Sequence, residues 1–90
     1  MLEFKTTKKF DKQYEQMCRR GADTSKLDKV IQTLLNEQPL EPKHADHPLK
    51  GNWIGHRECH VESDWLLIYK IDKGNLILTA VRTGTHSDLF

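Results

Sequence analysis

The sequence predicts an α+β fold in which two helices pack on one face of an antiparallel sheet, in the order β-α-α-β-β-β. Two segments before residue 40 carry apolar residues at helical spacing, whereas three segments after residue 52 have the composition of strands. The short connections between these three segments predict an antiparallel meander. We expect residues 1–90 to form one domain, because this length supports one small core.

The first strand is predicted from Leu2 to Thr6, where apolar and polar residues alternate. A helix is predicted to follow over Lys8–Arg20, with an N-cap at Thr6-Thr7 and an end at Gly21, which readily adopts a left-handed conformation. The apolar residues of this helix share one face: Phe10, Tyr14, Met17 and Cys18. We expect that face to pack in the core.

The second helix has the clearest amphipathic pattern in the chain. Its apolar residues repeat every three or four positions: Leu27, Val30, Ile31, Leu34 and Leu35. Ser25 followed by Asp28 resembles a capping box, and Pro39 is expected to end the helix. Such a helix is suited to covering a sheet.

The second half of the chain is predicted to hold a long loop and then three strands. The loop spans residues 36–52, which include all three prolines. The strands are predicted over Trp53–Val61, Trp65–Ile71 and Leu76–Arg82. Residues 72–75 form the turn between the last two strands, where Gly and Asn are expected to supply positive φ angles.

Composition excludes several classes of protein. The net charge of +1 gives no global basic field of the kind that free nucleic-acid binders carry. Residues 1–20 are nevertheless locally basic, with six Lys or Arg against three Asp or Glu, and this segment is either a solvated helix face or a phosphate-contacting surface.

The predicted location is the cytoplasm. The first residues lack the apolar run of a signal peptide, and no apolar stretch approaches the ~20 residues of a membrane span. The two cysteines, Cys18 and Cys59, form no Cys-x-x-Cys pair. We interpret them as reduced, half-buried thiols, although one disulfide is possible.

Ionisable residues gather near the ends of the predicted strands: His47, His60, Asp64, Arg82 and His86. Metal-free RNA cleavage needs a base for the ribose 2′-OH, a fixed positive charge for the dianionic phosphorane, and an acid for the departing 5′-oxygen. Histidine exchanges protons near neutral pH, and the planar guanidinium of arginine binds phosphate. This set of side chains therefore has the chemistry that such a reaction requires.

Each of these residues also has a structural interpretation. His47 can cap a loop turn, and His60 can be a solvent-facing strand residue. Asp64 can be the turn residue between two strands, and Arg82 can guard a sheet edge. His86, near the end of the chain, can be unstructured.

Metal binding and aromatic stacking are further interpretations. Two histidine pairs have ligand-like spacing, but no cysteine pair accompanies them: His44-x-x-His47 and His56-x-x-x-His60. Trp65 opens a buried strand and is expected in the core. Phe90, the last residue, has the alternative of stacking on a nucleobase, which is worth ~1–3 kcal/mol.

Three blocks of sequence, taken together, identify a family. They are residues 46–53 (DHPLKGNW), 60–70 (HVESDWLLIYK) and 82–90 (RTGTHSDLF). Their order and spacing resemble the YafQ-type branch of the RelE/ParE toxin superfamily over the whole chain. Ser63 departs from the pattern, because proline is common at that position.

The resemblance implies a microbial ribonuclease-like fold and a type II toxin that cleaves mRNA in the ribosomal A site. It implies a cognate antitoxin that neutralises the toxin and binds operator DNA with it, and it implies no metal or cofactor. The catalytic residues of the family fall on His47, His60, Asp64, Arg82, His86 and Phe90. Trp65 matches a position beside the site, and we expect substrate contacts from four residues: Trp65, Lys8, Lys9 and Lys12.

Our hypothesis for the mechanism assigns a role to each catalytic group. Asp64 and one histidine, either His60 or His47, activate the 2′-OH. Arg82 stabilises the phosphorane and His86 serves as the general acid, while Phe90 orients a base. Two rival functions stay open: a ParE-like toxin that inhibits DNA gyrase without cleaving RNA, and a non-catalytic module that acts in co-repression with its antitoxin.

Overall fold

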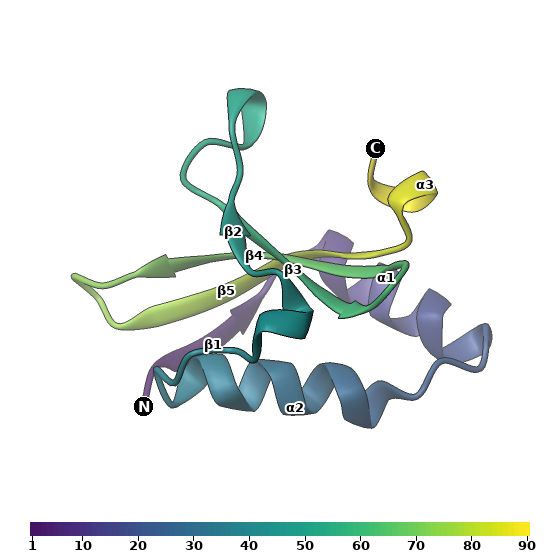
Figure 1. The fold of residues 1–90 in the computed structure, drawn as a ribbon, viewed down its shortest axis with the longest axis horizontal. Helices are drawn as coiled ribbons and strands as arrows, with labels where there is room; N and C mark the ends of the chain where they lie inside the picture. Colours follow the sequence, from purple (N-terminus) through teal and green to yellow (C-terminus); the bar gives the residue numbers. More distant parts are fainter.

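The computed structural model describes residues 1–90 and contains one five-stranded sheet with the order β1-β5-β4-β3-β2 (Figure 1). The strands are β1 (Glu3–Thr6), β2 (His47–Pro48), β3 (Arg57–Glu62), β4 (Trp65–Asp72) and β5 (Ile77–Gly84). The α+β class and the antiparallel meander of the last three strands are confirmed. The sheet as a whole is mixed, however, because β1 pairs in parallel with β5.

The helices are α1 (Lys8–Arg19), α2 (Thr24–Leu35) and the short C-terminal α3 (His86–Leu89). The predicted start and end of α1 are confirmed, since the Thr7 hydroxyl accepts a hydrogen bond from the Phe10 amide and Gly21 has a φ of +84°. The predicted cap of α2 is wrong. Asp23 is the N-cap, because its carboxylate accepts the Ser25 amide at 3.1 Å.

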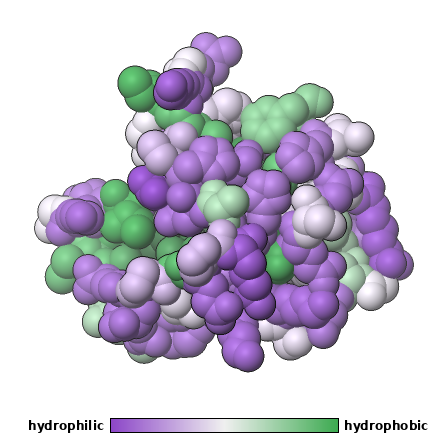
Figure 2. Space-filling view, in the orientation of Figure 1, coloured by the Kyte–Doolittle hydropathy of each residue, from purple (hydrophilic) through white to green (hydrophobic).

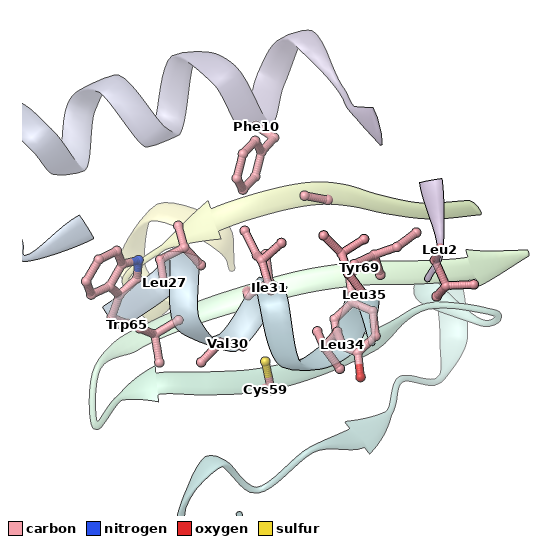
Figure 3. Close-up of a cluster of buried hydrophobic side chains, with 14 of the residues drawn as sticks. Leu2, Phe10, Leu27, Val30, Ile31, Leu34, Leu35, Cys59, Trp65 and Tyr69 are labelled. Atoms are coloured by element: carbon pink, nitrogen blue, oxygen red, sulfur yellow. The ribbon is translucent and has the colours of Figure 1, made fainter. Parts of the chain in front are cut away.

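The main core lies between the sheet and the two long helices, which pack on the same face. Figure 3 shows Phe10 of α1 and the apolar residues of α2 meeting side chains of the sheet. The predicted face of α2 is confirmed, because all five of its apolar residues are buried. The predicted face of α1 is only partly buried, since Tyr14 is half-buried and Cys18 is exposed.

A smaller cluster covers part of the opposite face of the sheet. Leu66 and Ile68 of β4 pack there with Leu89 of α3, and Trp53 borders them. Figure 1 shows α2 on one side of the sheet and the segment between β2 and β3 projecting on the other. The surface seen in this direction is mostly hydrophilic, with separate hydrophobic spots, one of them near the tip of the projecting segment (Figure 2).

Three local predictions differ from the structure. The loop over residues 36–52 contains the edge strand β2 and two short 3₁₀ helices, Pro42–His44 and Gly51–Trp53. Consequently β3 begins at Arg57 rather than at residue 53. In the β4–β5 turn Leu76 has the positive φ, of 56°, and Asp72 holds the turn by accepting the Asn75 amide.

The two cysteines are free, and neither is half-buried. Cys18 is exposed, whereas Cys59 is fully buried on β3. Burial raises the pKa of the Cys59 thiol to about 12, so this residue stays a neutral part of the core. None of the helices combines the length and the apolar character needed to cross a membrane.

We expect Leu27→Ala to lower the free energy of unfolding by about 2–5 kcal/mol, because the substitution leaves a cavity among well-packed neighbours. Leu27 has no exposed surface and is part of the main core. Urea denaturation measures the effect. Gln32→Ala, on the exposed face of the same helix, is the control and should change stability little; equal effects of the two substitutions would contradict this account of the core.

Candidate active site

The register of the sheet brings Asp64 and His86 together. Leu66 of β4 pairs with Gly84 of β5. Asp64 lies two residues before Leu66 in the two-residue turn between β3 and β4, and His86 lies two residues after Gly84 at the start of α3. Figure 1 shows this turn and α3 at the same end of the sheet.

Asp64 and His86 form a direct pair. The Asp64 Oδ1 atom accepts hydrogen bonds from His86 Nδ1 at 2.7 Å and from the His86 backbone amide at 3.1 Å. The hydrogen bond from the imidazole, assisted by the amide, lowers the pKa of Asp64 from its usual range. An ionised carboxylate only accepts, so Nδ1 carries a proton and Nε2 is left to face solvent or a substrate.

His60 lies beside this pair. The centroids of the His60 and His86 rings are 5.8 Å apart. The His60 Nδ1 atom lies 3.3 Å from the Ser63 carbonyl, which can only accept, so Nδ1 is the donor and Nε2 of the neutral ring holds a lone pair. A β-bulge follows His60, a feature that often redirects side chains near active sites.

His47 lies apart from these two histidines, on the edge strand β2. Its register partner is Glu58 of β3, and its Nε2 atom lies 3.6 Å from the buried Glu58 carboxylate. Its Nδ1 atom contacts the Ala45 carbonyl at 2.6 Å. These contacts hold the His47 ring at the border of the site, apart from His60 and His86.

Arg82 of β5 is held from two directions. Its Nε atom donates to the Gln13 side chain of α1 at 3.1 Å, and one terminal nitrogen donates to the Asp88 carbonyl of α3 at 3.3 Å. The guanidinium carbon also lies 6.0 Å from the ring centre of Trp53, within the range of cation–π attraction. The charge is thus fixed beside α3 before any substrate binds.

Trp65 and Phe90 have opposite surroundings. Trp65 is 3% exposed and its indole donates to the buried Thr83 hydroxyl at 3.0 Å, so the prediction of direct substrate contact is wrong. Its role in the core is confirmed. Phe90 is 63% exposed, and its backbone amide bonds the His86 carbonyl at the end of α3, which leaves the ring free to stack.

The lysines of α1 are exposed. One of them, Lys9, lies on the same side of the helix as Gln13, which contacts Arg82. Lys9 is one turn before Gln13 and lies on the same helical stripe, which continues to Arg20. Lys8 and Lys12 flank this stripe, so their part in substrate binding stays a prediction. No three His, Cys, Asp or Glu side chains are grouped in a way that would hold a metal ion.

Sequence reasoning missed several residues that hold the site. Gln13 and Trp53 both contact Arg82. Nothing in the sequence around either residue indicates these contacts. Asp88 was detectable, because Thr85-x-x-Asp88 has capping-box spacing. The structure contains that box: the Thr85 amide donates to Asp88 at 2.9 Å, and the Asp88 amide donates to the Thr85 hydroxyl at 3.2 Å.

Asp88 gives a pH-dependent prediction. Its hydrogen bonds from Arg20 and Thr85 hold the pKa of Asp88 well below its usual range. A carboxyl whose pKa is lower in the folded state stabilises the fold fully above its unfolded pKa of about 4 and less as the pH falls further. We therefore expect Asp88→Asn to lower Tm by a constant amount from pH 5 to 8 and by less below pH 4. Thermal melts across this range test it, and a difference that grows on acidification would contradict it.

The fold and the site together define a class of protein. Two long helices on one face of a five-stranded sheet are the arrangement of a RelE-like toxin, and this chain places histidine, aspartate and arginine at one end of that sheet. Residues 2–90 match the family described as "Bacterial toxin of type II toxin-antitoxin system, YafQ", and the chain belongs to this family.

Individual relatives agree with this membership. The chain is 51% identical over 75 residues to the mRNA interferase toxin YafQ of Escherichia coli K12, covering 80% of this chain and 77% of the relative. The crystal structure of a metal-bound toxin from Helicobacter pylori matches with a TM-score of 0.94, 49% identity and full coverage of both chains. A structure of the E. coli DinJ-YafQ complex matches with a TM-score of 0.91 and 37% identity, covering 100% of this chain and 99% of the other.

Proposed function

We propose that this chain is the toxin of a type II toxin–antitoxin system and cleaves mRNA on the ribosome, in the cytoplasm, by acid–base catalysis without a metal. The observation that carries the proposal is the His86–Asp64 bond of 2.7 Å with the His60 ring beside it. The E. coli relative at 51% identity is named an mRNA interferase, which supports the same substrate here.

In the proposed reaction, His60 is the general base. Its Nε2 lone pair takes the proton from the ribose 2′-OH, and the 2′-oxygen attacks the adjacent phosphorus. The bond from phosphorus to the 5′-oxygen breaks, and that oxygen takes a proton from Nε2 of protonated His86. The products are a 2′,3′-cyclic phosphate and a 5′-OH, so protons and bonds balance.

Asp64 acts on the acid rather than on the base in this scheme. It bonds His86 Nδ1, which fixes the orientation of the ring and leaves Nε2 for the leaving group, in the way a carboxylate orients histidine in catalytic triads. The earlier hypothesis joined Asp64 to the activation of the 2′-OH. The hydrogen bond to His86 favours the assignment to the leaving-group side.

The remaining site residues are assigned to charge and orientation. Arg82 supplies the fixed cation for the phosphorane, because contacts from α1, α3 and Trp53 hold its guanidinium. His47 contacts the bound RNA from the sheet edge. Phe90 stacks on a base of the bound mRNA, and the exposed lysines of α1 contact the phosphate backbone.

The proposed partners are the ribosome with its mRNA and a cognate antitoxin. A structure of the E. coli DinJ-YafQ complex matches this chain in fold. This match supports a neutralising antitoxin here. Operator DNA would be bound only through the toxin–antitoxin complex. A surface groove between α2 and residues 39–44 borders His60 but none of the other catalytic groups.

The test is a map of cut sites on a translated message, with untranslated message as the control. We expect cuts at defined positions within codons only when ribosomes translate. Expression in cells separates the rivals: a DNA-damage response with intact mRNA would indicate gyrase inhibition, and the absence of growth arrest would indicate a non-catalytic module. Either result would contradict the proposal.

A further inference from the structure

The helix that carries His86 is too short to be stable alone. It has four residues, whereas isolated helices below ~12–15 residues are marginal in water. Buried Leu89 ties its far end to Leu66 and Ile68 of β4. The position of its first turn, where His86 lies, must come from other contacts with the rest of the fold.

Asp88 is the residue on which those contacts converge. Its carboxylate closes the capping box with Thr85, and its carbonyl accepts from Arg82. The side chain also lies directly over Gly84, where an added Cβ would come within 2.9 Å of it. With its φ of +153°, Gly84 is suited to this close approach.

Arg20 holds the same carboxylate from outside the helix. Its two terminal nitrogens donate to Asp88 Oδ2 at 2.7 Å and to Oδ1 at 3.1 Å, although the two residues are 68 positions apart in the sequence. This is the bidentate geometry in which an arginine fixes direction as well as distance. Arg20 caps the C-terminal end of α1, so the pair links a long, packed helix to α3.

We propose that Arg20 is a positioning residue for mRNA cleavage, which fixes α3 through Asp88 so that His86 stays aligned with Asp64 and Arg82. The inference rests on the proposed function. Arg20 touches none of the reacting groups itself. Its side chain is 42% exposed and that of Asp88 is 20% exposed, so the pair contributes to local geometry more than to global stability.

The same link reaches the phosphate-binding group. Arg82 donates to the backbone carbonyl of Asp88, while Arg20 binds the carboxylate of that residue. A shift of α3 therefore moves the contact that orients Arg82 along with the ring of His86. Misplacement of reacting groups by about 1 Å can cost 10²-fold in rate, so a small displacement is enough for a measurable effect.

The experiment compares Arg20→Ala, Arg20→Lys, Asp88→Asn and the double variant Arg20→Ala/Asp88→Asn in the full chain. We expect Arg20→Ala to lower kcat on translated mRNA by about 10-fold or more with little change in KM. Lysine should restore part of the rate, because it keeps the charge but loses the fork. The double variant should be no slower than the slower single variant. Arg19→Ala is the matched control, since Arg19 contacts only Glu15, at 3.9 Å, and should leave kcat unchanged.

Amide hydrogen exchange gives a readout that does not need activity. The Leu89 and Phe90 amides bond the Thr85 and His86 carbonyls within α3. They should exchange faster in Arg20→Ala while core amides are unchanged. A raised KM with unchanged kcat would assign Arg20 to ribosome or RNA binding, and unchanged exchange with unchanged kcat would remove the link; both overturn the inference. Faster exchange combined with wild-type cutting by His86→Gln would leave the link in place and overturn the proposed function instead.

Discussion

His86→Gln is expected to reduce cleavage of translated mRNA by about 10²–10⁴-fold, the range that a general acid contributes. Glutamine keeps the size and polarity of the side chain but cannot deliver a proton to the departing 5′-oxygen. The side chain of His86 is 55% exposed, so the fold should tolerate the change. Single-turnover cutting of a message on stalled, programmed ribosomes measures the chemical step.

Ser87→Ala is the control for this variant, because Ser87 is an exposed neighbour in the same short helix. It should cut at the wild-type rate and melt at a similar temperature. If His86→Gln also cut at the wild-type rate, while melting like the wild type, His86 would not be the acid.

Arg82→Ala is expected to reduce kcat by about 10²–10³-fold, the cost of losing one group that stabilises the anion formed in the transition state. Arg82 is held by Gln13 and by the Asp88 carbonyl, so its charge is in place before the phosphorane forms. The same single-turnover assay measures the loss. Arg82→Lys should recover only part of it, because the compact ammonium lacks the planar fork of donors that binds phosphate while it is held by Gln13 and Asp88.

One control variant and one intermediate variant accompany Arg82→Ala. Lys73→Ala removes an exposed cation from the β4–β5 turn and should leave kcat unchanged. Gln13→Ala keeps the arginine but removes its anchor, and should give an intermediate rate. Cutting by Arg82→Ala at the rate of the Lys73→Ala control would exclude Arg82 as the phosphorane-stabilising group.

Periodicity predicted the elements that contribute many buried side chains, α2 and β4. The apolar repeat of α2 and the continuous apolar run of β4 each identify an element whose burial is intrinsic to its own sequence. It did not predict β2, because a two-residue edge strand ending in proline has no periodicity and exists only through its pairing with β3. Likewise, α3 forms because Thr85 and Asp88 cap it and Leu89 is buried. Four residues are too few to show a helical repeat in the sequence.

The sequence predicted which residues form the site, but not which of them contact one another. The block order indicated which side chains belong together, and the register of β4 with β5 then explains why Asp64 meets His86. The assignment of Asp64 to one histidine depends on that three-dimensional contact, as does the separation of His47 at the sheet edge. Trp65 shows that a role assigned from a matching family position can fail, because a residue next to a site residue in sequence can be part of the core.

The chemistry of the cut ends tests the central claim most directly. The reaction proposed for His60 and His86 uses the ribose 2′-OH as the nucleophile, so cut mRNA should carry a 2′,3′-cyclic phosphate and a 5′-OH. A single 2′-deoxy nucleotide at a mapped cut site should abolish cutting there and leave other sites unchanged. A 5′-phosphate with a 3′-OH, or full cutting at the 2′-deoxy position, would contradict the account.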